Sequence, residues 1–330
     1  EEAVYLANKM NLKGLLWDSA LVGASVVILP LPKEGIEKRT VLHSWAQAMV
    51  SCSILGRYLI VKPELGTTEK DMSTIEGAAR EAKREGHKIY GVTPELYIPV
   101  ATSRKRKEGV WSHRKWQSTG ISIVESLITA ARMLKRHPER FSHIRPFKDR
   151  ELRIIIDGES NIANMVVKLL LSPADGFGYW KPNHCPLAYR SPNHGLLAYR
   201  ELLNEIGLEI KIVGICDDQF ALSAPEGLLN IELLDRLTGE PKNLPELIKG
   251  EVEESMLVSR EKVLSQEADI LIVADTRRNN LEEDYRNLKV ALVIEGVANP
   301  VKEEFYCNLE RQGILCIPSI IATGGGAYTS

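Results

Sequence analysis

The sequence predicts an α/β protein whose C-terminal part forms a doubly wound parallel sheet of the Rossmann type. Short apolar strands alternate with helices from residue 152 to residue 317, a pattern typical of a parallel sheet covered on both faces. The stretch LRIIIDGESNIANMVV at 152–167 also runs from a strand through a glycine into a helix. This is the shape of a turn that binds the pyrophosphate of a dinucleotide.

Before residue 150 the pattern is mixed. Apolar runs at 26–31 and 58–62 predict strands on either side of a helix near 38–55. Thr67, Thr68 and Asp71 precede a helix that ends at Gly86, and 120–137 is a strongly amphipathic helix. Pro138 and Pro146 then indicate a linker. We therefore expect two domains, 1–138 and 139–330.

The second domain is expected to hold five strands and four helices in alternation. The predicted strands are 152–156, 209–215, 269–273, 290–294 and 314–317, and the helices are 161–171, 194–206, 244–266 and 301–312. Ligands of such sheets bind at the carboxyl ends of the strands. The polar clusters of this sequence lie at those ends.

Composition excludes several classes of protein. The chain has 330 residues, 44% of them hydrophobic and 26% charged, with a net charge of −2. We therefore expect no nucleic-acid or membrane partner. Five scattered cysteines without a CxxC pair predict reduced thiols and a cytoplasmic protein. A zinc site of Cys185, His184 and His194 lacks a recognised ligand spacing, so no metal is expected.

Two surface segments leave alternatives open. KPNHCPLAYR at 181–190 is followed directly by SPNHGLLAYR, within an insert near 172–195. This duplication is either a tolerated surface insertion or a loop that binds a partner. The basic stretch 102–116, with two tryptophans, is either a solvated loop or a lip that contacts an anionic ligand.

Several segments resemble, in the same order, those of the glutamate/leucine/phenylalanine/valine dehydrogenases, which deaminate amino acids oxidatively with NAD(P). The segments are MNLK (10–13), ALVGASVVI (20–28), VKPELGTTEKDM (61–72), STG (118–120), IVGICDD (212–218), ADILIV (268–273), EGVAN (295–299) and PSIIATGGGAYTS (318–330). The resemblance covers nearly the whole chain.

The resemblance implies an N-terminal α/β substrate and oligomerisation domain, then a C-terminal dinucleotide domain, with a cleft between them. It also implies a homo- or hetero-oligomer that takes a small amino or keto acid. In the family, strands precede the first of these segments and a helical tail follows the last. We expect both to be missing here.

The resemblance assigns three catalytic positions. Lys13 matches the lysine that binds the substrate carboxylate. Twelve residues later, Ser25 stands where the family has its catalytic lysine, and Glu64 stands where it has an aspartate. A serine hydroxyl carries no positive charge and cannot do the acid–base work of a lysine at neutral pH, a loss that costs about 10²–10⁴-fold in rate. Glutamate places its carboxylate one methylene further out.

The cofactor positions depart less from the family. Gly158 gives the tight turn and Ala163 the close helix–strand approach, but Ser160 stands where the backbone meets the pyrophosphate. Asp217 is expected to hold the adenosine ribose and so favours NAD. The resemblance adds Asn161 to the turn and Thr119 and Asn299 to the nicotinamide site. The sequence therefore predicts a weakened NAD site.

Two hypotheses follow. In the first, the chain is a divergent amino-acid dehydrogenase whose NAD-dependent deamination is lost or altered. In the second, it is a non-catalytic regulatory or structural homologue that partners an active dehydrogenase. Lys13, Glu64 and Asp217 favour the first, whereas Ser25 and Ser160 favour the second.

Overall fold

A computed structural model describes two compact units of the chain. One unit spans Glu1–Ser118 with Gly326–Ser330, and the other spans Thr119–Gly325. The described residues are 2–16, 36–52, 54–55, 59, 61, 67–84, 101, 118–147, 151–158, 161–171, 207–217, 220–227, 252–274, 285–297 and 303–324. The units divide just before the predicted 120–137 helix rather than near residue 138, because that helix packs on the sheet of the second unit.

The first unit contains three described helices, α1 (Glu2–Leu16), α2 (Lys38–Ser51) and α3 (Glu69–Arg84). Leu42, Ala46 and Val50 of α2 share a buried cluster with Met72 and Ile75 of α3. Single parallel bridges join Leu55 to Leu59 and Val61 to Ala101. The predicted strand at 26–31 lies outside the described residues.

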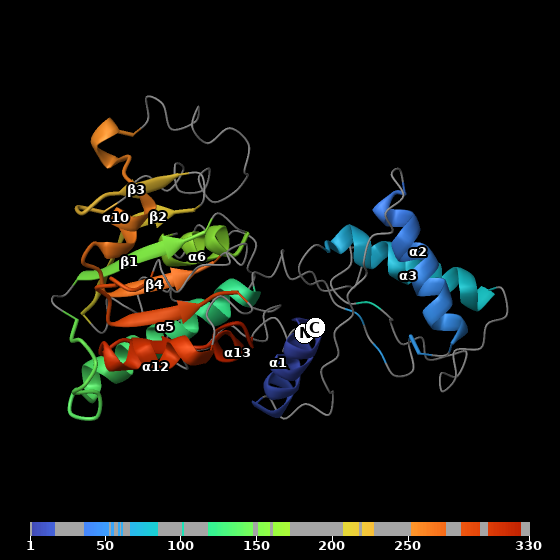
Figure 1. Ribbon diagram of the computed structural model, residues 1–330, viewed down its shortest axis with the longest axis horizontal. Coiled ribbons are helices and arrows are strands. Elements are labelled where there is room, and N and C mark those ends of the chain that lie inside the picture. Colours follow the sequence, from blue (N-terminus) through green and yellow to red (C-terminus); the bar gives the residue numbers. More distant parts are fainter. Residues whose placement is uncertain are drawn as a thin grey trace, which may run out of the picture. The chain divides into compact units, whose positions relative to one another are not determined.

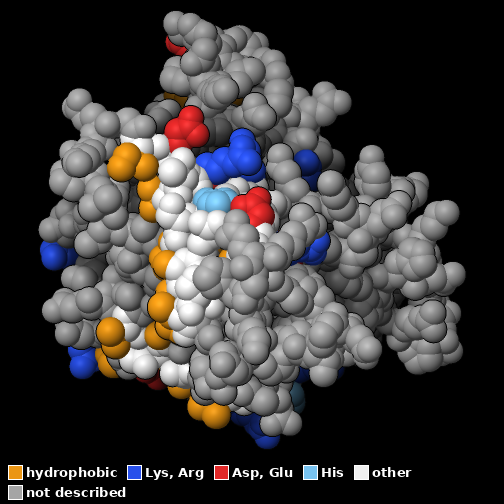
Figure 2. Space-filling view, turned by 90° about the vertical axis from the view of Figure 1, so that its right-hand side faces the viewer, with side chains coloured by type: hydrophobic (Ala, Val, Ile, Leu, Met, Phe, Trp, Pro, Cys, Tyr) orange, Lys and Arg blue, Asp and Glu red, His pale blue; other side chains and the backbone are white. Residues whose placement is uncertain are grey.

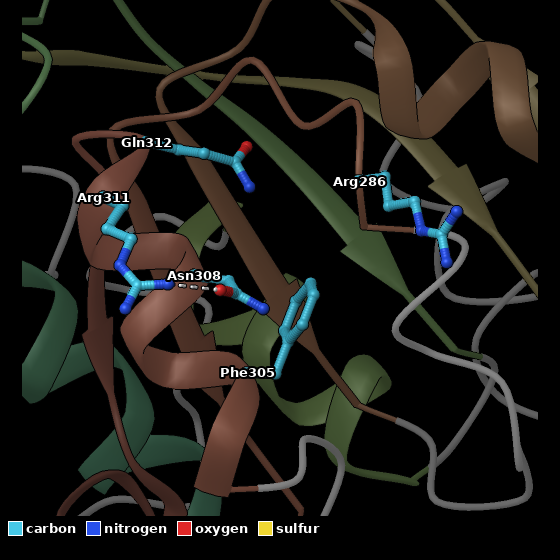
Figure 3. A pocket seen from close by; sticks show the side chains of 5 residues that line it. All are labelled: Arg286, Phe305, Asn308, Arg311 and Gln312. Carbon is cyan, nitrogen blue, oxygen red and sulfur yellow. Dashed lines mark hydrogen bonds between the residues drawn. The ribbon is translucent and has the colours of Figure 1, made fainter.

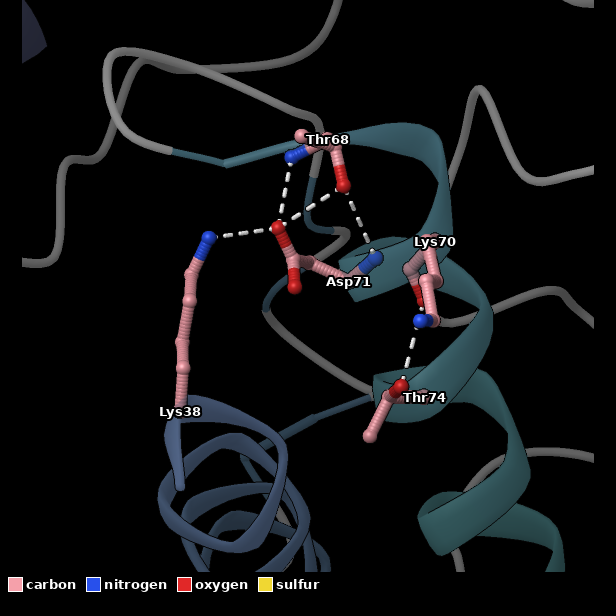
Figure 4. Close-up of polar contacts among 5 residues, drawn as sticks. All are labelled: Lys38, Thr68, Lys70, Asp71 and Thr74. Atoms are coloured by element: carbon pink, nitrogen blue, oxygen red, sulfur yellow. Dashed lines mark hydrogen bonds and ion pairs between the residues drawn. The ribbon is translucent and has the colours of Figure 1, made fainter. Parts of the chain in front are cut away.

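A polar network fixes the start of α3 (Figure 4). Asp71 Oδ2 accepts from the Thr68 amide at 2.8 Å and from the Thr68 hydroxyl at 2.9 Å, and Thr68 Oγ1 accepts from the Asp71 amide at 3.4 Å. This reciprocal pair is a capping box. Lys38 Nζ of α2 reaches the same carboxylate oxygen at 2.6 Å. Asp71 therefore joins α3 to α2 and, with Thr68, caps the start of α3.

The second unit is built on one mostly parallel sheet, which confirms the predicted fold class. Its strands are β1 (Glu151–Asp157), β2 (Glu209–Cys216), β3 (Ala221–Ser223), β4 (Ile270–Val273), β5 (Leu292–Glu295) and β6 (Leu315–Ile317). The order is β3-β2-β1-β4-β5-β6, and β3 alone pairs antiparallel to its neighbour. The strand order thus runs from β1 toward one side of the sheet and from β4 toward the other. Folds of this type bind ligands at the point where the order changes direction.

Helices cover both faces of this sheet (Figure 1). On one face, α5 (Ser118–Arg136), α6 (Asn161–Leu171) and α13 (Ser319–Ala322) share a buried cluster with the sheet. On the other face, α10 (Arg260–Ser265) and α12 (Glu303–Arg311) share the second cluster. Alternate residues of β1 enter opposite clusters, with Ile154 and Ile156 in one and Ile155 in the other.

The close approach of α5 to α6 depends on Gly120. A Cβ at this position would lie 2.7 Å from Met165 Cβ and 3.1 Å from Leu169 Cδ1, closer than side chains tolerate without a backbone shift. The glycine of the STG segment therefore lets the helix that opens the second unit lie against the helix that follows β1.

One predicted helix is wrong over its described part. In place of a continuous helix at 244–266, the structure has a short 3-10 helix at Glu254–Met256 and the six-residue α10. Between them Leu257 bridges to Leu222, and the Val258 amide donates to Ala221 O at 3.1 Å. Pairing with β3 therefore overrides the local helical pattern. The predicted helix at 194–206 and the insert near 172–195 lie outside the described residues.

Charges of both signs adjoin one another on the surface (Figure 2). On the first unit, for example, His43 Nε2 lies 2.7 Å from Glu81 Oε2. Among the described helices, none is long and apolar enough to span a bilayer. None of the described cysteines, Cys52, Cys216, Cys307 and Cys316, forms a disulfide.

We predict that Asp71→Ala lowers the stability of α3 by about 1 kcal/mol through loss of the capping box. The matched variant Lys38→Met removes only a half-exposed ion pair and costs a few tenths of a kcal/mol. Amide hydrogen exchange of residues 69–84 measures both effects.

The pKa of Asp71 makes this stabilisation depend on pH. Partial burial opposes ionisation of Asp71, but bonds from Lys38 and Thr68 outweigh it and hold its pKa below 3.8.

Because this folded-state pKa is lowered, the stabilisation by Asp71 is complete above pH 3.8 and is lost as the pH falls through the folded value. The difference between wild type and Asp71→Ala should therefore shrink in acid. A difference that stays constant from neutral pH to below pH 3.8 would contradict this role for the carboxylate.

Candidate functional site

Buried carboxylates gather at the carboxyl ends of the parallel strands. Asp157 ends β1, Asp217 directly follows β2 and Glu295 ends β5, and all three are less than 4% exposed. Because β1 and β2 are adjacent and parallel, Asp157 lies in register with Cys216, the residue before Asp217. The edge that the topology predicts to bind ligands thus concentrates ionisable groups.

Gly158 begins the turn as the sequence predicts. Its φ is 127°, in the region that favours glycine, and its amide donates to Cys216 O at 2.7 Å. Helix α6 then starts at Asn161, and Ala163 is fully buried on it. A strand, a left-handed glycine and a helix in close succession form the backbone framework of a phosphate-binding turn.

Asp157 is the centre of a buried polar network. Arg260, at the start of α10, donates from Nε to Oδ1 at 3.2 Å and from Nη2 to Oδ2 at 2.6 Å. The hydroxyl of Tyr285 donates to Oδ2 at 2.9 Å, and the thiol of Cys216 lies 3.5 Å from Oδ1. The carboxylate therefore receives a two-pronged charged bond together with two neutral donors.

The network controls the protonation of its members. Burial raises the pKa of Asp157 above 3.8, while Arg260 and Tyr285 act in the opposite direction. Burial, and secondly the charge of Asp157, raise the pKa of the Cys216 thiol and of the Tyr285 phenol well above their usual values. Both groups thus stay protonated at neutral pH and act as donors, and the thiol has none of the thiolate character of a nucleophile.

Asp217, the expected ribose ligand, shapes the turn between β2 and β3. Its Oδ1 accepts from the Phe220 amide at 2.7 Å, and its own amide donates to Phe220 O at 2.9 Å. The side chain is 3% exposed. Its place at the end of β2 is the one that the sequence predicts, and contact with a ribose stays a prediction.

Glu295 and Gly296, from the EGVAN segment, join the end of β5 to its neighbours. Glu295 accepts from the Tyr306 hydroxyl at 2.6 Å and from the Ser319 amide at 2.8 Å. A Cβ at Gly296 would lie 2.9 Å from Val273 O and 3.0 Å from Ile123 Cδ1. This segment therefore needs its glycine for the close approach of β5 to β4 and α5.

The other predicted site residues divide between the two units. Thr119, on α5, belongs to the second unit with Gly158, Ala163 and Asp217, whereas Lys13 lies in the last turn of α1 and is 9% exposed. Four others lie outside the described residues: Ser25, Glu64, Ser160 and Asn299. Asn161 is placed by its backbone as the first residue of α6.

Sequence reasoning missed Arg260, Tyr285 and the role of Asp157. The available signal was a charged residue at the end of an otherwise apolar buried strand, since such a group needs a partner. The identity of the partners carried no such signal, because Arg260 and Tyr285 are 103 and 128 residues away.

A hollow of about 360 Å³ lies elsewhere on the second unit, along α12. Its lining residues are Arg286, Phe305, Asn308, Arg311 and Gln312 (Figure 3). Arg311 Nη1 donates to Asn308 Oδ1 at 3.2 Å. None of the predicted catalytic or cofactor residues that the structure describes lines this hollow, so the strand ends remain the candidate site. Among the described residues no group of three or more His, Cys, Asp or Glu could hold a metal ion.

Comparison with known proteins identifies relatives of this chain. Residues 194–330 match the model of the Glutamate/Leucine/Phenylalanine/Valine dehydrogenase family. An NAD-specific glutamate dehydrogenase of Staphylococcus aureus is 33% identical over 125 residues, which are 37% of this chain and 28% of that protein. An NADP-specific glutamate dehydrogenase of Saccharolobus shibatae is 29% identical over 132 residues, 39% of this chain and 29% of that protein.

Solved structures share the fold. The hetero-hexameric glutamate dehydrogenase of Thermus thermophilus, in a leucine-bound form, superposes with a TM-score of 0.61 at 17% identity, over 100% of this chain and 63% of that one. The glutamate dehydrogenase of Plasmodium falciparum gives 0.60 at 14% identity, over 100% of this chain and 59% of that one. This chain thus spans less than two thirds of the length of these enzymes.

We predict that Gly158→Ala destabilises the second unit by about 1–3 kcal/mol, because a Cβ strains the left-handed backbone at this position. The matched control is Gly77→Ala within α3. An added Cβ there has no atom within 4 Å, so this change should stabilise its helix by about 0.5–1 kcal/mol. Urea denaturation of each variant measures the effect. Equal effects of the two substitutions would contradict the conformational role of Gly158.

Proposed function

Residues 194–330 match the glutamate/leucine/phenylalanine/valine dehydrogenase family, and from that match we propose that the chain is a member that binds a nicotinamide dinucleotide without deaminating amino acids by the lysine-dependent route. The observation that carries the proposal is the turn at Gly158, whose left-handed backbone links a buried strand to α6. The same sequence carries Ser25 where the family resemblance places the catalytic lysine.

The cofactor we propose is NAD. The buried carboxylate of Asp217 at the end of β2 suits a ribose with free hydroxyls, and it would repel the additional phosphate of NADP. Relatives of both specificities are known by name, so the family alone does not decide between them. Thr119 and Asn299 are the proposed contacts of the nicotinamide end, and Ser160 weakens the pyrophosphate contact.

The proposed loss of deamination follows from the missing positive charge at Ser25. Deamination requires a cation that stabilises the oxyanion formed as water adds to the substrate carbon, and a base that moves protons. Ser25 supplies neither, and Glu64 offers a carboxylate with a longer reach than an aspartate. Lys13 retains the group that would bind a substrate carboxylate. A small amino or keto acid can therefore bind without the residues that would turn it over in the usual way.

A second candidate function is a non-catalytic subunit that partners an active dehydrogenase. Ser25 favours it, and one structural neighbour of this chain is named as a hetero-hexameric enzyme. In this proposal the chain contributes a bound dinucleotide or amino acid as a regulatory signal to its partner. The free thiols agree with a cytoplasmic location for either candidate.

The proposal predicts binding without turnover. Titration of NADH and NADPH, followed by nucleotide fluorescence, should show saturable binding of NADH and weaker binding of NADPH. Assays with a panel of amino acids and NAD should show no deamination by wild type. Ser25→Lys combined with Glu64→Asp should gain measurable activity, because it restores the missing cation and the shorter carboxylate, groups worth about 10²–10⁴-fold each.

Ser25→Arg combined with Glu64→Asp is the matched control. It restores positive charge but not an amine that can give up a proton, and should stay inactive. Deamination by wild type would refute the proposed loss of chemistry. A failure of both wild type and variants to bind NADH would refute the proposed cofactor.

A further inference from the structure

We propose that Arg260 is a positioning residue for the phosphate-binding turn, which it holds by clamping and neutralising the Asp157 carboxylate directly before Gly158. This inference deepens the proposed function, because it concerns the same dinucleotide site. It assigns this role to the first residue of α10, a helix that is distant from the turn in sequence.

The geometry of the clamp is specific. Both prongs of the Arg260 fork reach the carboxylate, Nε to Oδ1 at 3.2 Å and Nη2 to Oδ2 at 2.6 Å. The side chains are 16% and 2% exposed, so solvent screens the pair little. Tyr285 adds a bond to Oδ2 at 2.9 Å. Such a fork fixes the orientation of a carboxylate in a way that a lysine ammonium does not.

Hydrogen bonds also hold the backbone at Asp157. Asp157 O accepts from the amide of Ala274, the residue directly after β4, at 2.8 Å, and the next amide, that of Gly158, donates to Cys216 O at 2.7 Å. Gly158 itself is conformationally permissive. The direction in which the chain leaves β1 is therefore set by the residue before the glycine, and Arg260 holds the carboxylate of that residue by a two-pronged charged bond.

The clamp also reduces the charge repulsion between Asp157 and a bound pyrophosphate. A carboxylate next to the turn would repel the pyrophosphate of a dinucleotide, and low exposure would make that repulsion strong. Arg260 cancels this charge without touching the ligand. Removal of Arg260 should therefore weaken anion binding at the turn, and simultaneous removal of the Asp157 charge should restore it. A contact that only stabilised the fold would change the stability of the protein without changing the NADH affinity of its folded form.

The test compares four variants with wild type. Arg260→Met removes the clamp, Arg260→Lys keeps the charge without the fork, and Asp157→Asn with Arg260→Met removes both charges. Arg311→Met is the matched control, because Arg311 is an exposed arginine at the end of α12 whose Nη1 donates to Asn308 Oδ1 on the same helix. NADH fluorescence titration gives the dissociation constant. Hydrogen exchange of residues 151–163 without nucleotide reports the turn itself.

We expect Arg260→Met to raise the dissociation constant for NADH about tenfold or more and to speed exchange at the turn, because the buried Asp157 carboxylate loses its two-pronged charged bond. Arg260→Lys should fall between this variant and wild type, and it keeps the test decisive if Arg260→Met does not fold. The double variant should return to within about threefold of wild type. Arg311→Met should match wild type.

Unchanged NADH affinity and exchange in folded Arg260→Met and Arg260→Lys would overturn the inference, as would a double variant that binds no better than Arg260→Met. The proposed function fails in a different way, namely if wild type itself binds no NADH. In that event exchange at the turn still decides the role of Arg260: faster exchange in Arg260→Met that the double variant reverses supports it, and unchanged exchange refutes it.

Discussion

The burial of β1 on both faces is the constraint on which the second unit depends. Its apolar residues belong to two separate clusters, one under α5 and α6 and the other under α10 and α12. A strand in this position can end in a charged residue only if partners reach that residue inside the protein. Asp157 obtains these partners from α10 and from the turn before β5. The charged end of the central strand thus connects distant segments to the edge at which sheets of this type bind their ligands.

The residues proposed for cofactor binding depart less from the family than the positions proposed for catalysis. The glycine turn, the buried alanine of α6 and the carboxylate after β2 are the framework of the dinucleotide site that we propose. The positions that we propose to be altered for catalysis, Ser25 and Glu64, lie in the sequence range of the other unit. Cofactor binding and catalysis depend on different groups, so one can persist without the other. The proposed function describes a family member in which they have become uncoupled.

Much of this architecture could be predicted from the sequence because it follows local rules. Helix α6 occupies the predicted residues, and each predicted strand of the second unit is present within two residues at either end. Where prediction failed, a distant contact decided the outcome: residues 257–258 pair with β3 instead of continuing a helix. The Asp157 network could not be predicted for the same reason, since its partners are more than a hundred residues away. A charged residue at the end of a buried strand indicates that partners exist, but only the fold identifies them.

The central claim is that the strand ends of the second unit remain a working dinucleotide site. Hydrogen–deuterium exchange of the wild-type protein, with and without saturating NADH, tests it most directly because it maps where the nucleotide acts. We predict slower exchange at 157–163 and at 295–299 when NADH is present. Exchange that does not change with NADH, or that changes only between residues 1 and 118, would contradict the claim.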